Sequence, residues 1–402
     1  MCANQSTIFA FYLLTFAGLA IGGLVLAPLT DSYGKKKFFL ASLISILAIY
    51  CLILLSTDLQ LLHAYMLLYG IVLAVCVISG ILWVLQLMPK RDWPFLLMIF
   101  LIAEACMSFV VAAYFSYLKR SWKPMIEVAC VILFVLVAFL AFIPESLRYL
   151  YDERKYVELD EELMLISRSN NGTSDNLVGA KPYIRVQNQI DQPERDNSFA
   201  YLKNNSDSFL NIVCLGVIWI SATFNYYLIT HEIASQKMDI FTATLISGTA
   251  DIAGCVAGYL LYKHSSIGTA ISRSFILAFI GAAFVLSFVY AYHGSELVTM
   301  AFFLVICKVG LSAAVLLGFI ANVIVFKPRV HGTVFGICFA AAYIITLFAP
   351  VTTSSNPSWV PLAFLSLFAL FGSVIALVIK YEHLEDQTQQ DNLDDSILKI
   401  TS

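Results

Sequence analysis

Long apolar runs separated by short polar connections dominate the chain. A helix that crosses a bilayer needs about 20 mostly apolar residues, and eleven runs reach that length. Because lipid offers the backbone no hydrogen bonds, these runs are predicted to be helices. The predicted fold is an all-α polytopic membrane helix bundle. The eleven runs cover residues 8–30, 38–56, 62–88, 94–117, 125–143, 208–230, 240–261, 271–292, 297–325, 332–350 and 359–380.

The composition argues against other classes of protein. Hydrophobic residues make up 60% of the 402 residues and charged residues 13%, against roughly 45–50% and 25% in soluble domains. A soluble enzyme or nucleic-acid-binding protein this apolar could not cover its surface with polar groups. Eight of the nine cysteines lie inside apolar runs without metal-site spacing, and there is no phosphate-binding glycine loop. We therefore expect no enzymatic activity, no metal site and no cofactor.

The lysine and arginine residues predict the orientation. With the amino terminus outside, nineteen of the 24 fall in cytoplasmic segments or at their edges, and four fall outside. This bias follows the positive-inside rule, although the cluster Lys119, Arg120 and Lys123 runs against it.

The order of the spans predicts two half bundles. A polar segment divides the first five spans from the last six. Such an arrangement is typical of transporters, whose halves move around a site near the membrane midplane. The alternative is that the segment only joins two packed bundles. The predicted parts are an amino-terminal half over 1–143, a cytoplasmic linker over 144–207, helical to 168 and then disordered, a carboxy-terminal half over 208–380, and a cytoplasmic tail over 381–402.

The first cytoplasmic loop carries a candidate gate. Glycine at position 34 suits a tight turn, and Asp31 can accept hydrogen bonds from a helix start or pair with cations. The alternative is a plain positive-inside turn.

This loop, Ala27-Pro28-Leu29-Thr30-Asp31-Ser32-Tyr33-Gly34-Lys35-Lys36, resembles the G-x-x-x-D-R-x-G-R-R signature of the major facilitator superfamily. The match holds at Asp31, Gly34, Lys35 and Lys36, whereas Ala27 and Ser32 depart from it. The resemblance implies that the loop latches the inward gate closed.

Two further motifs resemble the organic-ion (cation/anion/carnitine) transporters of that superfamily. The first, Pro144-Glu145-Ser146-Leu147-Arg148-Tyr149-Leu150, is similar to the PESPRWL motif that follows the sixth helix of both sugar and organic-ion transporters, and it adds Glu145 and Arg148 to the gate. The second, Trp219-Ile220-Ser221-Ala222-Thr223-Phe224-Asn225-Tyr226-Tyr227, is similar to the WF…YYG run of the seventh helix. The QQ-SG run of sugar porters is absent there.

The resemblance also implies a correspondence between spans. The five spans before the linker match helices two to six of a twelve-helix fold, so the first helix and the outside loop behind it are expected to be missing. Two explanations remain open: an internal start in an incomplete gene model, or a naturally shortened form.

Three charged residues lie well inside spans, where charges are costly and mark functional candidates. They are Glu104, Asp251 and Lys308. Asp251 resembles an acidic position of the family's eighth helix, and Lys308 resembles a basic position of its tenth. The resemblance implies that Lys308 lies near the substrate cavity. The alternative is a structural ion pair between Asp251 and Lys308, and for Glu104 a structural role is favoured.

Aromatic residues are the other binding candidates, because ring faces attract cations. On helical geometry Trp219, Tyr226 and Tyr227 share one face of their span. Ordinary helix packing is an equally weighted alternative. Tyr343 aligns where some family members place an acid or an arginine, and as a neutral residue it selects neither charge.

The sequence thus predicts a plasma-membrane transporter that moves a small organic ion by rocking of two halves. The expected partners are that ion and membrane lipid, with no nucleic acid. Two alternatives stay open: a sugar-porter-like transporter, and a truncated or degenerate member without transport activity.

Overall fold

The computed structural model describes residues 5–118, 121–143, 145, 149–150, 155–169, 202, 206–235, 239–292, 297–353 and 359–379. In these ranges the chain forms helices joined by short connections and contains no strand. The predicted all-α membrane bundle is therefore confirmed.

Each of the eleven apolar runs is helical. The amino-terminal half contains α1 (Gln5–Ile21), α2 (Leu29–Tyr33), α3 (Lys35–Leu55), α4 (Leu59–Gln86), α5 (Trp93–Ala113) and α6 (Lys123–Ala141). The carboxy-terminal half contains α11 (Ser206–Ser235), α12 (Ile240–His264), α13 (Ile267–Tyr292), α14 (Leu297–Val325), α15 (His331–Thr346), α16 (Ala349–Thr353) and α17 (Val360–Ala376). Two π-helical segments, Gly22–Leu26 and Tyr114–Leu118, extend α1 and α5, and the 3-10 turns Lys90–Asp92 and Pro328–Val330 precede α5 and α15.

Ten helical segments among the described residues are long and apolar enough to cross a membrane, and α17 is shorter at 17 residues. The protein is therefore an integral membrane protein, with a span count close to the eleven predicted.

Helix starts are marked by residues that satisfy or remove free N–H groups. Asp58 accepts a hydrogen bond from the Gln60 N–H at the start of α4, and Asp239 accepts one from the Phe241 N–H at the start of α12. Proline stands in the first turn of α5, α6 and α17, where its missing N–H costs nothing.

The linker is described only in part. Within the segment predicted to be helical, the structure forms α8 (Tyr156–Ser169). Almost all of the stretch predicted to be disordered, and the tail over 381–402, lie outside the described residues.

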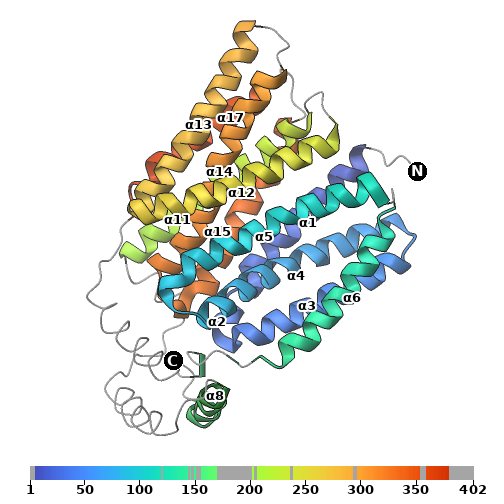
Figure 1. The fold of residues 1–402 in the computed structure, drawn as a ribbon, viewed down its shortest axis with the longest axis vertical. Helices are drawn as coiled ribbons and strands as arrows, with labels where there is room; N and C mark the ends of the chain where they lie inside the picture. The colour runs from blue at the N-terminus through green and yellow to red at the C-terminus, as the bar shows by residue number, and fades with distance from the viewer. Residues whose placement is uncertain are drawn as a thin grey trace.

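The two halves lie side by side, and two pairs of helices form the largest contacts between them (Figure 1). One pair is α1 with α15, and the other is α5 with α12. At the first crossing a Cβ added at Gly336 would collide with the carbonyl oxygen of Gly23, so only glycine lets these backbones approach so closely.

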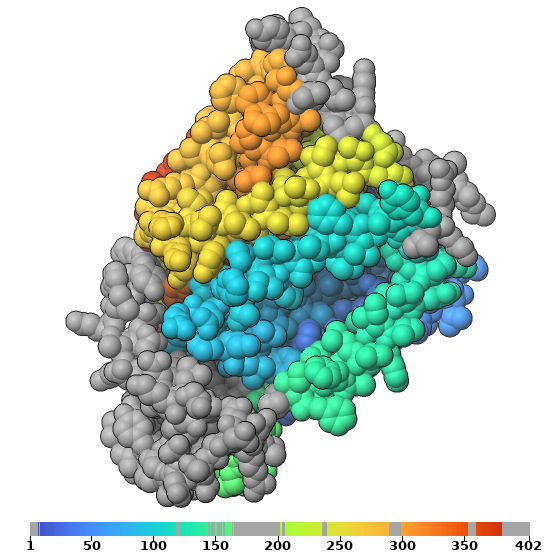
Figure 2. Space-filling view, in the orientation of Figure 1, coloured from blue at the N-terminus to red at the C-terminus, as the bar shows by residue number. Residues whose placement is uncertain are grey.

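Helix α5 packs mainly against the other half rather than its own. It lies along α12 and also contacts α14, whereas α6 packs on α3 and has no buried residue. Figure 2 shows α5 against α12 and a furrow between α5 and α6. The side of α5 that turns away from α12 is therefore open to this furrow.

Candidate functional site

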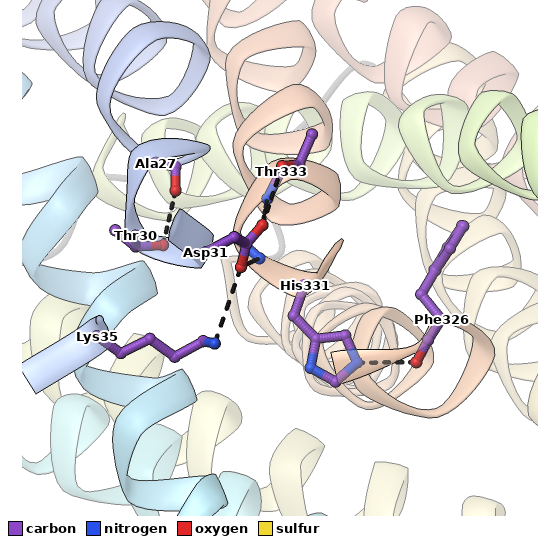
Figure 3. A network of polar contacts seen from close by, with 8 residues as sticks. Ala27, Thr30, Asp31, Lys35, Phe326, His331 and Thr333 are labelled. Atoms are coloured by element: carbon purple, nitrogen blue, oxygen red, sulfur yellow. Dashed lines mark hydrogen bonds and ion pairs between the residues drawn. The ribbon is translucent and has the colours of Figure 1, made fainter. Parts of the chain in front are cut away.

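The loop over 27–36 reaches from one half to the other (Figure 3). The Asp31 carboxylate accepts hydrogen bonds from the Gly332 N–H at 2.9 Å and the Thr333 N–H at 2.8 Å, and from the Thr333 hydroxyl at 2.9 Å. Lys35 Nζ lies 3.8 Å from the same carboxylate. We call these four residues the Asp31 latch.

The latch surrounds Asp31 with groups that favour a negative charge, and these groups oppose the larger effect of burial. Gly332 and Thr333 lie in the first turn of α15, whose free N–H groups carry the positive end of the helix dipole. The Asp31 side chain is 2% exposed. Burial raises the pKa of the Asp31 carboxyl, while Lys35 and the donors from Thr333 and Gly332 act in the opposite direction. Donors from the opposite half thus take the place of the water molecules that would hydrate an exposed carboxylate.

Sequence reasoning did not identify the α15 side of the latch. A Cβ at Gly332 would collide with Thr30 Oγ1 and lie 2.8 Å from Asp31 Oδ1, so glycine is required for α2 to approach. The neighbouring His331 is 2% exposed, and its Nε2 lies 2.8 Å from the Phe326 carbonyl oxygen. The available signal was Pro328 shortly before an apolar run, which marks a helix start and hence a group of free N–H donors.

Gly34 forms the turn between α2 and α3. Its φ of 98° and ψ of 137° lie in a region that side-chain-bearing residues rarely adopt. A Cβ added there would also lie 3.0 Å from Cζ of Tyr149. Backbone angle and space both exclude a larger residue at this turn.

We expect Gly34→Ala to destabilise the protein by about 1–3 kcal/mol, the typical cost of a strained backbone angle. The measurement is the thermal unfolding midpoint of the purified protein in detergent. Gly216→Ala is the matched control, because a Cβ there meets nothing within 4 Å and α11 has ordinary helical geometry. Adding Tyr149→Ala relieves the contact but not the angle, so it should restore only part of the loss. An unchanged midpoint for Gly34→Ala would contradict the strain argument.

The other residues predicted for the gate lie nearby or outside the described part of the chain. Lys36 Nζ donates to the Ala141 carbonyl oxygen at 3.4 Å, which ties the start of α3 to the end of α6. Glu145 is half-buried. Arg148 lies outside the described residues.

At the centre of the carboxy-terminal half, Asp251 of α12 meets Lys308 of α14. Lys308 Nζ lies 3.5 Å from Asp251 Oδ1, and the two side chains are 1% and 11% exposed. The same Nζ donates to the Thr230 hydroxyl at 2.7 Å. The Tyr226 hydroxyl donates to Asp251 Oδ2 at 2.9 Å, and the Ser312 hydroxyl donates to Oδ1 at 2.6 Å. We call Asp251 and Lys308 the central ion pair; each charge in it is hydrogen-bonded as well as paired.

The three rings of the α11 motif do not form one surface. Lys308 Nζ lies 3.8 Å from the centroid of the Tyr226 ring, so this ring face binds a cation of the protein itself. Trp219 is 4% exposed and packs edge-on against Phe319 at 4.8 Å. The Tyr227 ring instead packs edge-on against Phe16 of the other half. Neighbouring residues in a helix point about 100° apart, which separates Tyr226 from Tyr227.

A cluster of rings joins the halves, and two of its members come from α1. The centroid of the Phe16 ring lies 5.6 Å from that of Tyr227 and 5.6 Å from that of Tyr343. The centroids of the Tyr12 and Tyr227 rings are 6.5 Å apart. We call Tyr12, Phe16, Tyr227 and Tyr343 the ring cluster. Sequence reasoning missed Tyr12 and Phe16, although their spacing of four residues places them on one face of a helix.

Glu104 lies near the middle of the apolar segment that contains α5. The residue is exposed, and among the described residues its carboxylate has no hydrogen bond or ion pair. It lies within electrostatic reach of Asp251, Tyr226 and Tyr343 in the opposite half. The described part of the chain contains no group of three or more His, Cys, Asp or Glu residues that could hold a metal ion.

The sequence is similar to known membrane transport proteins. A sequence profile described as Major Facilitator Superfamily matches residues 3–350. Solute carrier family 22 member 7 of Bos taurus is 19% identical over 272 residues, which is 66% of this chain and 48% of that protein. The chain thus spans about half the length of this curated relative.

Solved structures show the same fold. The proton:xylose symporter XylE bound to 6-bromo-6-deoxy-D-glucose superposes with a TM-score of 0.69 at 13% identity, over 94% of this chain and 88% of that one. A double-tryptophan mutant of XylE gives a TM-score of 0.67 at 13% identity, over 96% and 88%. At this identity the likeness concerns the fold alone.

Proposed function

The chain belongs to the major facilitator superfamily, and from this premise we propose that it moves a small organic ion across the membrane by alternating access. Family and fold indicate a membrane transporter of small molecules rather than an enzyme. The choice of an organic ion is supported by the seventh-helix motif and by the similarity to solute carrier family 22 member 7.

The observation that carries the mechanism is the Asp31 latch. It joins α2 of one half to α15 of the other through a single carboxylate, at the membrane face predicted to be cytoplasmic. A bond between halves at one end exists only while that end is closed. Breaking it allows the halves over 1–143 and 208–380 to separate there, with the 144–207 linker keeping them together.

The proposed substrate region lies between the latch and the opposite face. It combines the ring cluster with the polar groups around the central ion pair, and so offers both ring faces and charge to an organic ion. Tyr227 and Tyr343 are proposed to contact the substrate directly. Trp219 and Tyr226 support the region from behind, because other side chains cover their rings.

A plasma-membrane location and membership of the organic-ion family are part of the proposal. So is the correspondence of the five amino-terminal spans with helices two to six of that family.

The test is uptake by cells that display the chain at their surface. The panel is radiolabelled tetraethylammonium, para-aminohippurate and xylose, and we expect at least one of the two organic ions to accumulate above its level in cells with empty vector. A second organic ion of the same charge should compete with it, and excess xylose should not. Accumulation of none of the three at verified surface expression would overturn the proposal in favour of a member without transport activity.

A sugar-porter-like function is the second candidate. The structures that superpose on this chain include a proton:xylose symporter, and this observation favours it. Xylose uptake that charged competitors leave unchanged would select this candidate over the first.

A further inference from the structure

The charges at the membrane centre do not cancel among the described residues. Asp251 and Lys308 neutralise each other at 3.5 Å. Glu104 is the third charged residue near the middle of a described span. No described residue forms a hydrogen bond or ion pair with its carboxylate. When all three are ionised, the centre therefore carries one uncompensated negative charge. An unpaired charge at this depth is unfavourable, so a transported cation that pairs with it gains binding energy.

The position of Glu104 suits a ligand rather than the protein interior. Leu97, Leu101 and Ala105 are buried on the face of α5 that packs toward α12. Glu104 follows Leu97 by seven residues and Leu101 by three, so it lies at the edge of this same face, and Glu104 is exposed. The carboxylate thus lies at the edge of the interface between the two halves.

The ring cluster supplies the second element of the proposed site. Tyr343, within electrostatic reach of Glu104, belongs to the ring cluster together with Phe16 and Tyr227. A carboxylate beside several rings is a suitable site for an organic ammonium group, because the ring quadrupole attracts cations as the carboxylate does. Asp251 is less suited, because Lys308, Tyr226 and Ser312 already occupy its oxygens.

We propose that Glu104 is the counter-ion for a cationic group of the transported molecule and determines specificity for organic cations. This inference rests on the proposed function and adds to it the sign of the substrate's charge. Glu104 contributes the charge from the amino-terminal half, and the rings of α11 and α15 contribute from the other. Closure of the halves around the ligand therefore depends on a cation being present.

The experiment compares Glu104→Gln and Glu104→Asp with wild type, using tetraethylammonium as the cation and para-aminohippurate as the anion. We expect wild type to take up the cation. Glu104→Gln should raise KM for the cation at least tenfold at equal surface level, and Glu104→Asp should retain part of the uptake. The matched control is Glu127→Gln, which removes an acid near the outer end of α6 and should change nothing.

A binding measurement keeps the test decisive if a variant reaches the surface poorly. In purified protein, tetraethylammonium should raise the unfolding midpoint of wild type and Glu127→Gln but not that of Glu104→Gln. Cation uptake and binding by Glu104→Gln equal to wild type would overturn the inference. Selective anion uptake would overturn it as well and leave the proposed function standing. Uptake of neither ion would overturn both.

Discussion

Replacement of Asp31 by alanine is expected to reduce transport at least tenfold while the protein still reaches the membrane. The Gly332 and Thr333 N–H groups and the Thr333 hydroxyl would lose their acceptor in the closed gate. A buried donor without a partner costs about 1–3 kcal/mol. Because this cost falls only on the closed state, losing one such bond shifts the equilibrium between closed and open gate by about tenfold.

Two measurements check this result. Initial uptake rates report transport, and the labelling rate of a cysteine introduced by Thr30→Cys reports gate opening, since Thr30 is 0% exposed in the closed gate. Asp31→Ala should speed this labelling. Asp31→Asn should be intermediate, because an amide keeps one acceptor oxygen but no charge. Ser32→Ala is the matched control on the exposed side of α2. Wild-type uptake with unchanged labelling would show that the loop is an ordinary turn without a role in gating.

Replacement of Lys308 by methionine is expected to abolish surface expression or to lower the unfolding midpoint severely. The change leaves the Asp251 carboxylate in a buried site with only two hydroxyl donors. Removing one partner of a buried ion pair typically costs about 3–5 kcal/mol. Methionine has nearly the length of lysine, so lost volume contributes little to the effect.

The double variant Asp251→Asn with Lys308→Met separates a structural role from a transport role. If the pair is structural, the double variant should express better than Lys308→Met alone, because no buried charge is left without a partner. If Lys308→Met instead expresses well and changes substrate selectivity, Lys308 acts on the substrate. Wild-type expression and selectivity in Lys308→Met would contradict both roles.

Some interactions could be predicted from the sequence, because a charged residue inside a membrane has few possible partners. Lys308 and Asp251 lie inside apolar runs, and a buried ammonium there requires an acid or water. The expectation of an ion pair between them agrees with the 3.5 Å contact. The geometry also shows Thr230 and the Tyr226 ring as further partners of Lys308, which no spacing rule could indicate.

Other interactions depend on residues far apart in the chain. The motif selected Asp31, but its partners Gly332 and Thr333 lie about three hundred residues away. Similarly, helical geometry placed Trp219, Tyr226 and Tyr227 on one broad face. The packing around α11 assigns each ring to different neighbours: Phe319, Lys308 and Phe16.

The sequence by itself determined the helices, their approximate ends and the depth of each charge. These follow from local properties, because a backbone in lipid must satisfy its hydrogen bonds within its own helix and an apolar run has a required length. Only the tertiary structure decided that α5 packs on α12, that Asp31 meets α15 and that Glu104 is left without a partner among the described residues. The physical reason is that lipid is as apolar as the helices, so the hydrophobic pattern does not select which helix faces meet. That selection comes from close approach at small residues such as Gly336 and Gly332 and from a few buried polar bonds.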